Sequence, residues 1–207
     1  MILILYGPDK FRSSRKLNEI IEHYKKTNKK SLNLKYFDAE TDNLEELFDW
    51  LKQSPMFREK KMVVLKNALK LYNHFKDFSK SDNILLFFDE SQTLPELEGI
   101  KAQKFDFLSG IKLRDWVKKE FERFGLKVNS EVVDKMIKFI GSDSWRINNE
   151  IKKLACYCQN RSVSIRDIEL LVNPKIETDI FKTVMHLAFR NKKQALELIH
   201  KHLEKGD

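Results

Sequence analysis

Short apolar runs alternate with helical patterns over the first half of the chain, and this alternation constrains the fold more than any other feature. The predicted strands cover residues 1–6, 32–37, 62–65, 84–88 and 105–107. Between them, apolar residues recur at the three- and four-residue spacing of an amphipathic helix, and one such helix is predicted over 67–78. Strands separated by helices are typical of a parallel sheet covered on both faces. The sequence therefore predicts an α/β domain over residues 1–111.

From Lys112 onward the sequence shows helical patterns alone. Apolar spacing predicts four helices, which end before the break at Asn173-Pro174. The first is outlined by residues 113–121, the second runs from a cap at Ser130 to Gly141, the third covers 145–157, and the fourth runs from a cap at Ser164 to Val172. We expect residues 112–174 to form a small helical domain. Two further amphipathic helices, joined at Asn191, follow, and two helices cannot close a core by themselves. Residues 175–207 are therefore predicted to begin a third, all-helical domain that continues further or packs on other subunits.

The charge and the apolar content limit the classes of partner. The net charge of +8 favours a polyanion such as DNA, although charges that alternate along helix faces are equally typical of a solvated surface. No apolar run reaches the roughly 18 to 20 residues needed to cross a bilayer, so we expect a cytoplasmic protein without a membrane partner.

Cys156 and Cys158 are spaced poorly for a disulfide and supply half a zinc site at most. We expect no metal.

Residues 7–14 occupy the place, between a first strand and a helix, where a phosphate-binding P-loop would lie. Only Gly7 and Ser14 agree with that motif, because Arg12 replaces its second glycine and Ser13 its lysine. Without the small residue and the lysine, a phosphate loses both a close backbone approach and a fixed cation. The sequence predicts a degenerate P-loop, no bound nucleotide cofactor and no nucleotide hydrolysis.

The apolar run 84–88 ends in Asp89 and Glu90, which resembles a Walker B strand. Without a P-loop lysine there is no nucleotide for a metal to bridge, and the run is the fourth strand in chain order, not the third. The five histidines form no pattern typical of a catalytic triad. We therefore predict no catalytic residue.

The stretch Gln53-Ser54-Pro55-Met56-Phe57 lies between a helical pattern and the strand at 62–65. Its two large apolar side chains either fill the core or face a partner. Most Met and Phe side chains are buried, so the residues alone favour the core.

These pieces together resemble the delta subunit of the bacterial DNA polymerase III clamp loader. The resemblance rests on Tyr6-Gly7, residues 53–65, residues 148–155 and the helical patterns of residues 181–203. It implies an AAA+-like parallel-sheet domain with a degenerate P-loop over 1–111, a helical lid over 112–174 and the first helices of an all-α collar over 175–207. It also implies a subunit that does not hydrolyse ATP but grips the sliding clamp and opens it.

The resemblance reverses the interpretation of the stretch at 53–57. The family's Q-x-x-L-F-like motif for clamp binding falls on Gln53, Met56 and Phe57, with Pro55 between them, and Met in place of Leu conserves volume. Met56 and Phe57 are then expected to be at least partly exposed.

The implied partners are the sliding clamp (beta subunit), the other clamp-loader subunits through the collar helices and, secondarily, primed DNA. We expect Arg58, Lys60 and Lys61 to steer the chain toward an acidic clamp surface. Two alternatives stay open: a divergent P-loop ATPase that uses Ser14 with the acids after residue 88, and a basic DNA-binding module without clamp activity.

Overall fold

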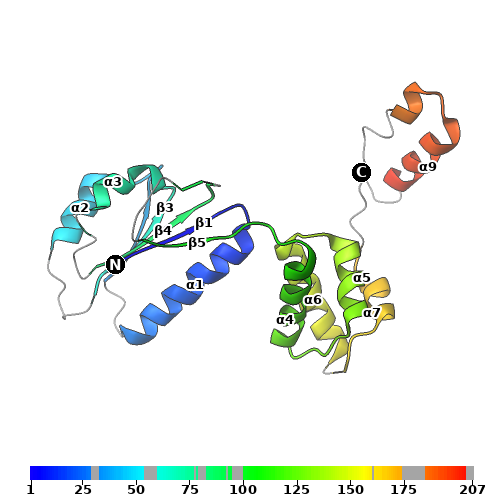
Figure 1. Cartoon of the computed structure of the whole chain (residues 1–207), viewed down its shortest axis with the longest axis horizontal. Helices are drawn as coiled ribbons and strands as arrows, with labels where there is room; N and C mark the ends of the chain where they lie inside the picture. Colours follow the sequence, from blue (N-terminus) through cyan, green and yellow to red (C-terminus); the bar gives the residue numbers. More distant parts are fainter. Residues whose placement is uncertain are drawn as a thin grey trace. The chain divides into compact units, whose positions relative to one another are not determined.

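The computed structural model (Figure 1) describes residues 1–28, 33–53, 60–76, 78, 83–91, 93–94, 100–159, 161–173 and 185–203. The chain divides into two compact units. Unit 1 comprises Met1–Val117 and Ser142–Asn149, and unit 2 comprises Lys118–Gly141 and Glu150–Asp207. The division into domains 1–111, 112–174 and 175–207 stays a prediction.

Unit 1 contains a five-stranded sheet in which every pairing is parallel and the strand order is β2-β3-β4-β1-β5. The strands are β1 (Ile2–Tyr6), β2 (Leu34–Asp38), β3 (Met62–Lys66), β4 (Ile84–Asp89) and β5 (Lys101–Lys104). The α/β fold class predicted from the alternation is confirmed.

The fifth strand lies four residues before the predicted one. β5 is Lys101–Lys104 and its four residues are exposed, whereas the prediction placed the strand at residues 105–107, which contain two phenylalanines. An edge strand that pairs only with β1 needs no apolar side chains. The prediction followed hydrophobicity, which this strand lacks.

Helices cover both faces of the sheet (Figure 1). One face packs against α2 (Leu44–Lys52), the 3-10 turn Leu69–Leu71 and α3 (Tyr72–Phe75), and the other packs against α1 (Lys10–Thr27). Phe75 and Phe87 meet edge to face at the centre of the first core, with ring centroids 5.6 Å apart. The helix predicted over 67–78 was too long, because Asn67 takes a positive φ of 52° and the turn that follows is 3-10.

The helices after residue 109 lie close to their predicted bounds. They are α4 (Gly110–Arg123), α5 (Ser130–Ile140), α6 (Ser144–Cys158), α7 (Ile165–Leu171) and α9 (Lys192–Leu203), with residues 185–188 also helical. Asn129, not Ser130, caps α5, because its side chain accepts a hydrogen bond from the Val132 amide at 3.0 Å. Among the described residues, no helix is both long and apolar enough to span a membrane.

A buried acid stabilises α7 in unit 2. Asp167 forms a capping box with Ser164 and a two-point ion pair with Arg161, in which both N–O distances are 2.7 Å. These hydrogen bonds from Arg161 and Ser164 hold the pKa of Asp167 well below its usual range. The acid therefore stabilises unit 2 above its unfolded pKa of about 4, and this contribution is lost as the pH falls from there through the lowered folded value.

We expect Asp167→Asn to lower the free energy of unfolding at pH 7 by about 1 to 2 kcal/mol. Its loss of stability below about pH 4 should also be shallower than that of the unmodified chain. Urea unfolding across this pH range measures both effects. Glu169→Gln is the control: Glu169 is an exposed acid that pairs with Lys135, and such surface pairs contribute little. Equal effects of the two substitutions would contradict the assignment.

Candidate functional site

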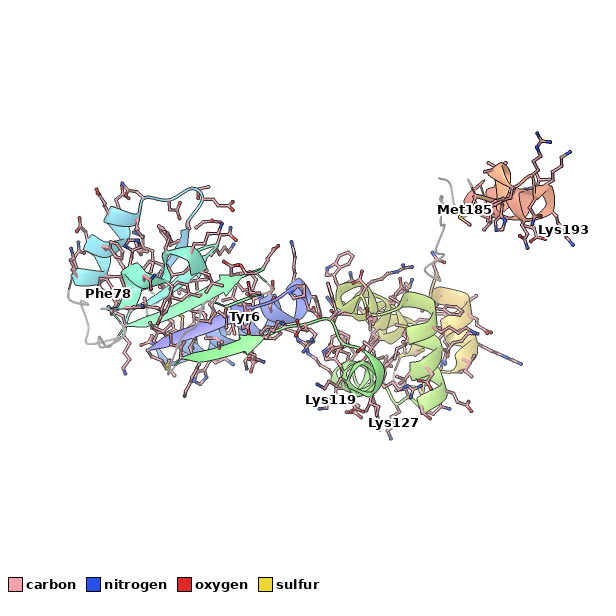
Figure 2. The ribbon with its side chains drawn as sticks, turned by 45° about the horizontal axis from the view of Figure 1, so that its top comes forward. Tyr6, Phe78, Lys119, Lys127, Met185 and Lys193 are labelled. Atoms are coloured by element: carbon pink, nitrogen blue, oxygen red, sulfur yellow. The ribbon has the colours of Figure 1, made fainter. Side chains whose placement is uncertain are left out.

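Folds of this kind bind ligands at the carboxyl edge of the sheet. In this protein β1 ends at that edge, between β4 and β5. Tyr6 (Figure 2), the last residue of β1, is in register with Asp89 on β4 and with Lys104 on β5. Although β4 is the fourth strand along the chain, it lies directly beside β1 in the sheet. The acids at the end of β4 therefore do reach the loop after β1, where Glu90 pairs with Lys10, and the argument from chain order was wrong.

Gly7 lets this loop pass close to the chain after β5. Its φ is +121°, and a β-carbon there would lie 2.6 Å from the carbonyl oxygen of Phe105. Two backbone hydrogen bonds fix the approach: the Phe105 amide donates to the Tyr6 carbonyl at 2.7 Å, and the Asp9 amide donates to the Phe105 carbonyl at 2.9 Å. An amide that a P-loop would offer to phosphate is thus already used inside the protein.

A carboxylate occupies the N-terminus of α1. Asp9 is 2% exposed and is the N-cap of the helix. Its Oδ1 accepts hydrogen bonds from the Arg12 amide at 3.1 Å and from the Ser144 hydroxyl at 2.7 Å, and its Oδ2 accepts one from Arg12 Nη1 at 3.3 Å. The positive end of a helix attracts an anion. Here the protein's own side chain supplies that anion.

The basic groups of the loop also have partners within the chain. Arg12 donates a second bond to the Asp106 carbonyl at 2.9 Å, and Lys10 Nζ lies 2.6 Å from a carboxylate oxygen of Glu90. Ser13, at the position of the P-loop lysine, is buried, and its hydroxyl donates to the Lys10 carbonyl at 3.2 Å. Ser14 is half-buried in α1. The loop is therefore a helix N-cap whose polar groups bond to one another.

We expect Asp9→Ala to lower the free energy of unfolding by about 2 kcal/mol, because it removes the cap and leaves the buried Ser144 hydroxyl without its acceptor. Chemical denaturation measures the loss. Asp143→Ala is the matched control, since Asp143 caps α6 by accepting from the Arg146 amide but is exposed; its loss should be about 1 kcal/mol. Equal losses would show that the buried bonds of Asp9 add nothing to the cap.

The acids after β4 do not assemble a metal site within the part of the chain that the structure describes. Asp89 accepts a hydrogen bond from the Ser91 amide at 2.8 Å, and Glu90 pairs with Lys10. No group of three or more candidate ligands is found among the described residues.

The predicted clamp-binding stretch begins at the end of α2. Gln53 is the C-cap of α2, is exposed, and donates its amide to the Asp49 carbonyl at 3.3 Å. Pro55, Met56 and Phe57 lie outside the described residues, so the predictions of their exposure and role stay predictions.

The expected role of Lys61 in electrostatic steering is wrong, because the residue is 3% exposed. Its ammonium donates hydrogen bonds to the carbonyl oxygens of Trp50 and Gln53, and burial lowers its pKa. Lys61 comes directly before β3, whose first four residues are buried on both faces of the sheet. Lys60, one position earlier, is exposed, as the prediction required.

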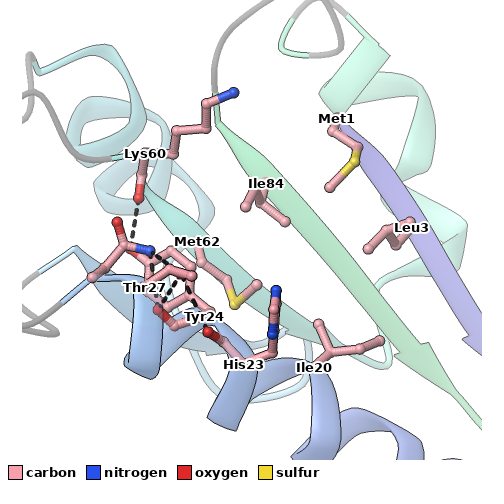
Figure 3. Close-up of a pocket in the computed structure, with 10 residues that line it drawn as sticks. Met1, Leu3, Ile20, His23, Tyr24, Thr27, Lys60, Met62 and Ile84 are labelled. Carbon is pink, nitrogen blue, oxygen red and sulfur yellow. Dashed lines mark hydrogen bonds between the residues drawn. The ribbon is translucent and has the colours of Figure 1, made fainter.

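A groove of about 570 Å³ lies on the α1 side of the sheet (Figure 3). It is lined by Met1, Leu3, Ile20, His23, Tyr24, Thr27, Asn28, Lys60, Met62 and Ile84. In the described part of unit 1, α1 is the helix in the core on this face, and one helix is narrower than five strands. The groove is the part of the sheet that α1 leaves uncovered.

The fold is that of an AAA+-like protein. The structure is similar to that of the Bacillus subtilis DNA clamp loader delta protein (YqeN), with a TM-score of 0.68 and 17% identity over 100% of this chain and 68% of that one. It is also similar to the Thermotoga maritima RuvB Holliday junction branch migration motor, with a TM-score of 0.55 and 14% identity over 90% of this chain and 68% of that one.

Residues 3–93 match the family described as DNA polymerase III, delta subunit. The match covers less than half of the 207 residues, but it includes both the loop after β1 and the stretch at 53–57. The family resemblance stated from the sequence is thereby confirmed. A comparison with curated proteins finds no match.

Sequence reasoning missed Asp9 and Ser144, which shape the first site, and assigned the wrong role to Lys61 at the second. An aspartate directly before a helical pattern is a typical N-cap, and this signal was available for Asp9. No pattern connects Ser144 with Asp9 across 135 positions. A lysine next to a strand is normally exposed, so nothing in the sequence distinguished Lys61 from Lys60.

Proposed function

We propose that this chain is a clamp-loader delta subunit of the replicative DNA polymerase III holoenzyme, working in the cytoplasm. It binds the sliding clamp and helps to open the ring for loading onto primed DNA. The observation that carries the proposal is the combination of an AAA+-like sheet with a first loop that the chain's own carboxylate, Asp9, closes. It occurs in a chain whose residues 3–93 match the delta-subunit family.

The subunit is not catalytic by itself and takes part in a DNA-directed DNA polymerase complex whose other subunits supply the ATPase. A γ-phosphate entering the loop would meet the Asp9 carboxylate, and two negative charges in contact repel each other. The cations that would offset this repulsion, Lys10 and Arg12, already pair with Glu90 and Asp9.

Clamp binding uses Gln53, Pro55, Met56 and Phe57. Two apolar side chains inserted into a pocket contribute roughly 1.5 to 3 kcal/mol each, and Gln53 fixes their orientation. Tight binding alone does not open a ring, because a ligand shifts an equilibrium only by its difference in affinity for the two states. The subunit therefore fits the sprung clamp better than the closed one.

The C-terminal helices provide the contacts to other clamp-loader subunits. Met185, Leu187, Phe189 and Leu196 are each more than half exposed, at 54%, 55%, 76% and 64%. Large apolar side chains gathered on a short stretch of chain are typical of a protein interface.

The test measures binding of the full chain to the sliding clamp of the same organism by calorimetry, with and without ATP. A dye pair across one interface of the ring reports opening. We expect a stoichiometric complex, opening without ATP, and no heat of ATP binding to the chain alone. No binding to the clamp would overturn the proposal. ATP binding to the chain would favour the divergent ATPase, and binding to DNA alone with a steep loss of affinity in salt would favour the DNA-binding module.

A further inference from the structure

Lys61 is the buried lysine among the described residues, and it stands at the exit of the segment 54–59. The chain leaves α2 at Gln53, and Lys60 is the next described residue, two positions before β3. The surroundings of these two points determine how the predicted clamp-binding residues are held.

The ammonium of Lys61 joins the two points. It donates hydrogen bonds to the carbonyl oxygens of Trp50, in the last turn of α2, and of Gln53, the C-cap. It also lies 4.5 Å from the centroid of the Trp50 ring. The last carbonyl groups of a helix have no partner inside it and carry a partial negative charge, so a cation there stabilises the helix end. Lys61 thus ties the end of α2 to the start of β3.

A second tether fixes the exit of the segment from the side of α1. The Tyr24 hydroxyl donates to the Lys60 carbonyl at 2.6 Å (Figure 3), and it lies 3.3 Å from the Asn33 carbonyl oxygen. The Lys61 carbonyl in turn accepts from the Ile84 amide at 2.8 Å. The backbone at Lys60 and Lys61 is therefore held from two directions.

Burying an ammonium group is unfavourable, and burial lowers the pKa of Lys61 accordingly. A methionine at this position would fill similar space without the cost of removing a charge from water. The charged group therefore does something that an apolar side chain cannot. It donates hydrogen bonds to the carbonyl oxygens of Trp50 and Gln53, where the chain enters the segment.

We propose that Lys61 is a positioning residue that clasps the base of the segment 54–59, so that Met56 and Phe57 reach the clamp from two fixed ends at Gln53 and Lys60. The inference rests on the proposed clamp binding. A segment whose ends are already fixed loses less conformational freedom on binding, so the clasp raises affinity without touching the partner.

The test has two readouts on Lys61→Met in the full chain. Hydrogen exchange of the backbone amides from Gln53 to Lys61, measured without clamp, should become about tenfold faster, while the amides of α1 keep their protection. The affinity for the sliding clamp should fall by about tenfold. Cooperative urea unfolding establishes that the variant is folded.

Two further variants sharpen the result. Lys60→Met removes the same charge one position away but leaves the clasp and the Lys60 carbonyl in place, and its hydrogen exchange should be unchanged. Tyr24→Phe removes the second tether without changing charge, and it should speed exchange severalfold. If Lys61→Met fails to fold, Tyr24→Phe carries both readouts.

Faster exchange together with weaker clamp binding supports the clasp. Unchanged exchange in the folded Lys61→Met variant overturns it, and so does unchanged affinity beside faster exchange. If the unmodified chain does not bind the clamp, the proposed function fails, and exchange without clamp decides by itself whether Lys61 holds the segment.

Discussion

Replacing both Met56 and Phe57 with alanine is expected to weaken binding to the sliding clamp by about 10²- to 10⁴-fold. The estimate follows from losing two buried apolar side chains at roughly 1.5 to 3 kcal/mol each. Calorimetry with the clamp measures the affinity, and circular dichroism with urea unfolding measures whether the fold is kept. The ring-opening signal should fall with the affinity, since opening uses the same contacts.

The matched control removes one phenylalanine and one aliphatic side chain elsewhere. Phe107 and Leu170 are 61% and 69% exposed, so Phe107→Ala with Leu170→Ala removes two apolar side chains of similar size from the surface. This control should bind the clamp with unchanged affinity. If the double variant at Met56 and Phe57 also binds unchanged while folded, the anchor assignment is wrong. If it unfolds, the two side chains belong to the core.

Gly7→Ala is expected to lower the free energy of unfolding by about 3 to 5 kcal/mol. The new β-carbon would lie 2.6 Å from the Phe105 carbonyl oxygen, and the φ of +121° is one that residues with side chains rarely adopt. The three nearest heavy atoms all belong to the backbone of Phe105, which cannot rotate away as a flexible side chain can. Thermal or urea unfolding of unit 1 measures the loss.

Gly125→Ala separates the two causes. Gly125 also has a positive φ, +73°, but nothing lies within 4 Å of the position of its β-carbon. It should lose only about 1 kcal/mol, from backbone strain alone. A loss as small as this for Gly7→Ala would mean that the loop after β1 moves away from Phe105 easily. Gly7 would then not be needed for the close approach.

Sequence patterns predicted most of unit 1. Strands β1, β3 and β4 were found because buried parallel strands form continuous apolar runs, and α1 because its apolar face repeats at helical spacing. β5 was misplaced because an exposed edge strand has no such run. The helix after β3 was too long in the prediction, since hydrophobic spacing does not distinguish a 3-10 turn from an α-helix.

The two candidate sites were predicted unequally. The loss of the P-loop lysine and second glycine could be read directly at Ser13 and Arg12. The closure of that loop by Asp9 could not, because its hydroxyl partner, Ser144, is 135 positions away. At the other site, the family resemblance assigns clamp binding to Gln53, Met56 and Phe57, which stays a prediction. The sequence assigned Lys61 to the surface, where the structure buries it.

The sequence by itself determined the parallel α/β class, the resemblance to the delta-subunit family and the absence of a complete P-loop motif. These properties depend on residue types and local spacing, which a sequence displays directly. Only the tertiary structure decided that Asp9 supplies the anion at the start of α1 and that Lys61 ties the end of α2 to the start of β3. Both depend on which distant groups meet when the sheet is assembled, because a charge acts through neighbours in space, whatever their separation along the chain.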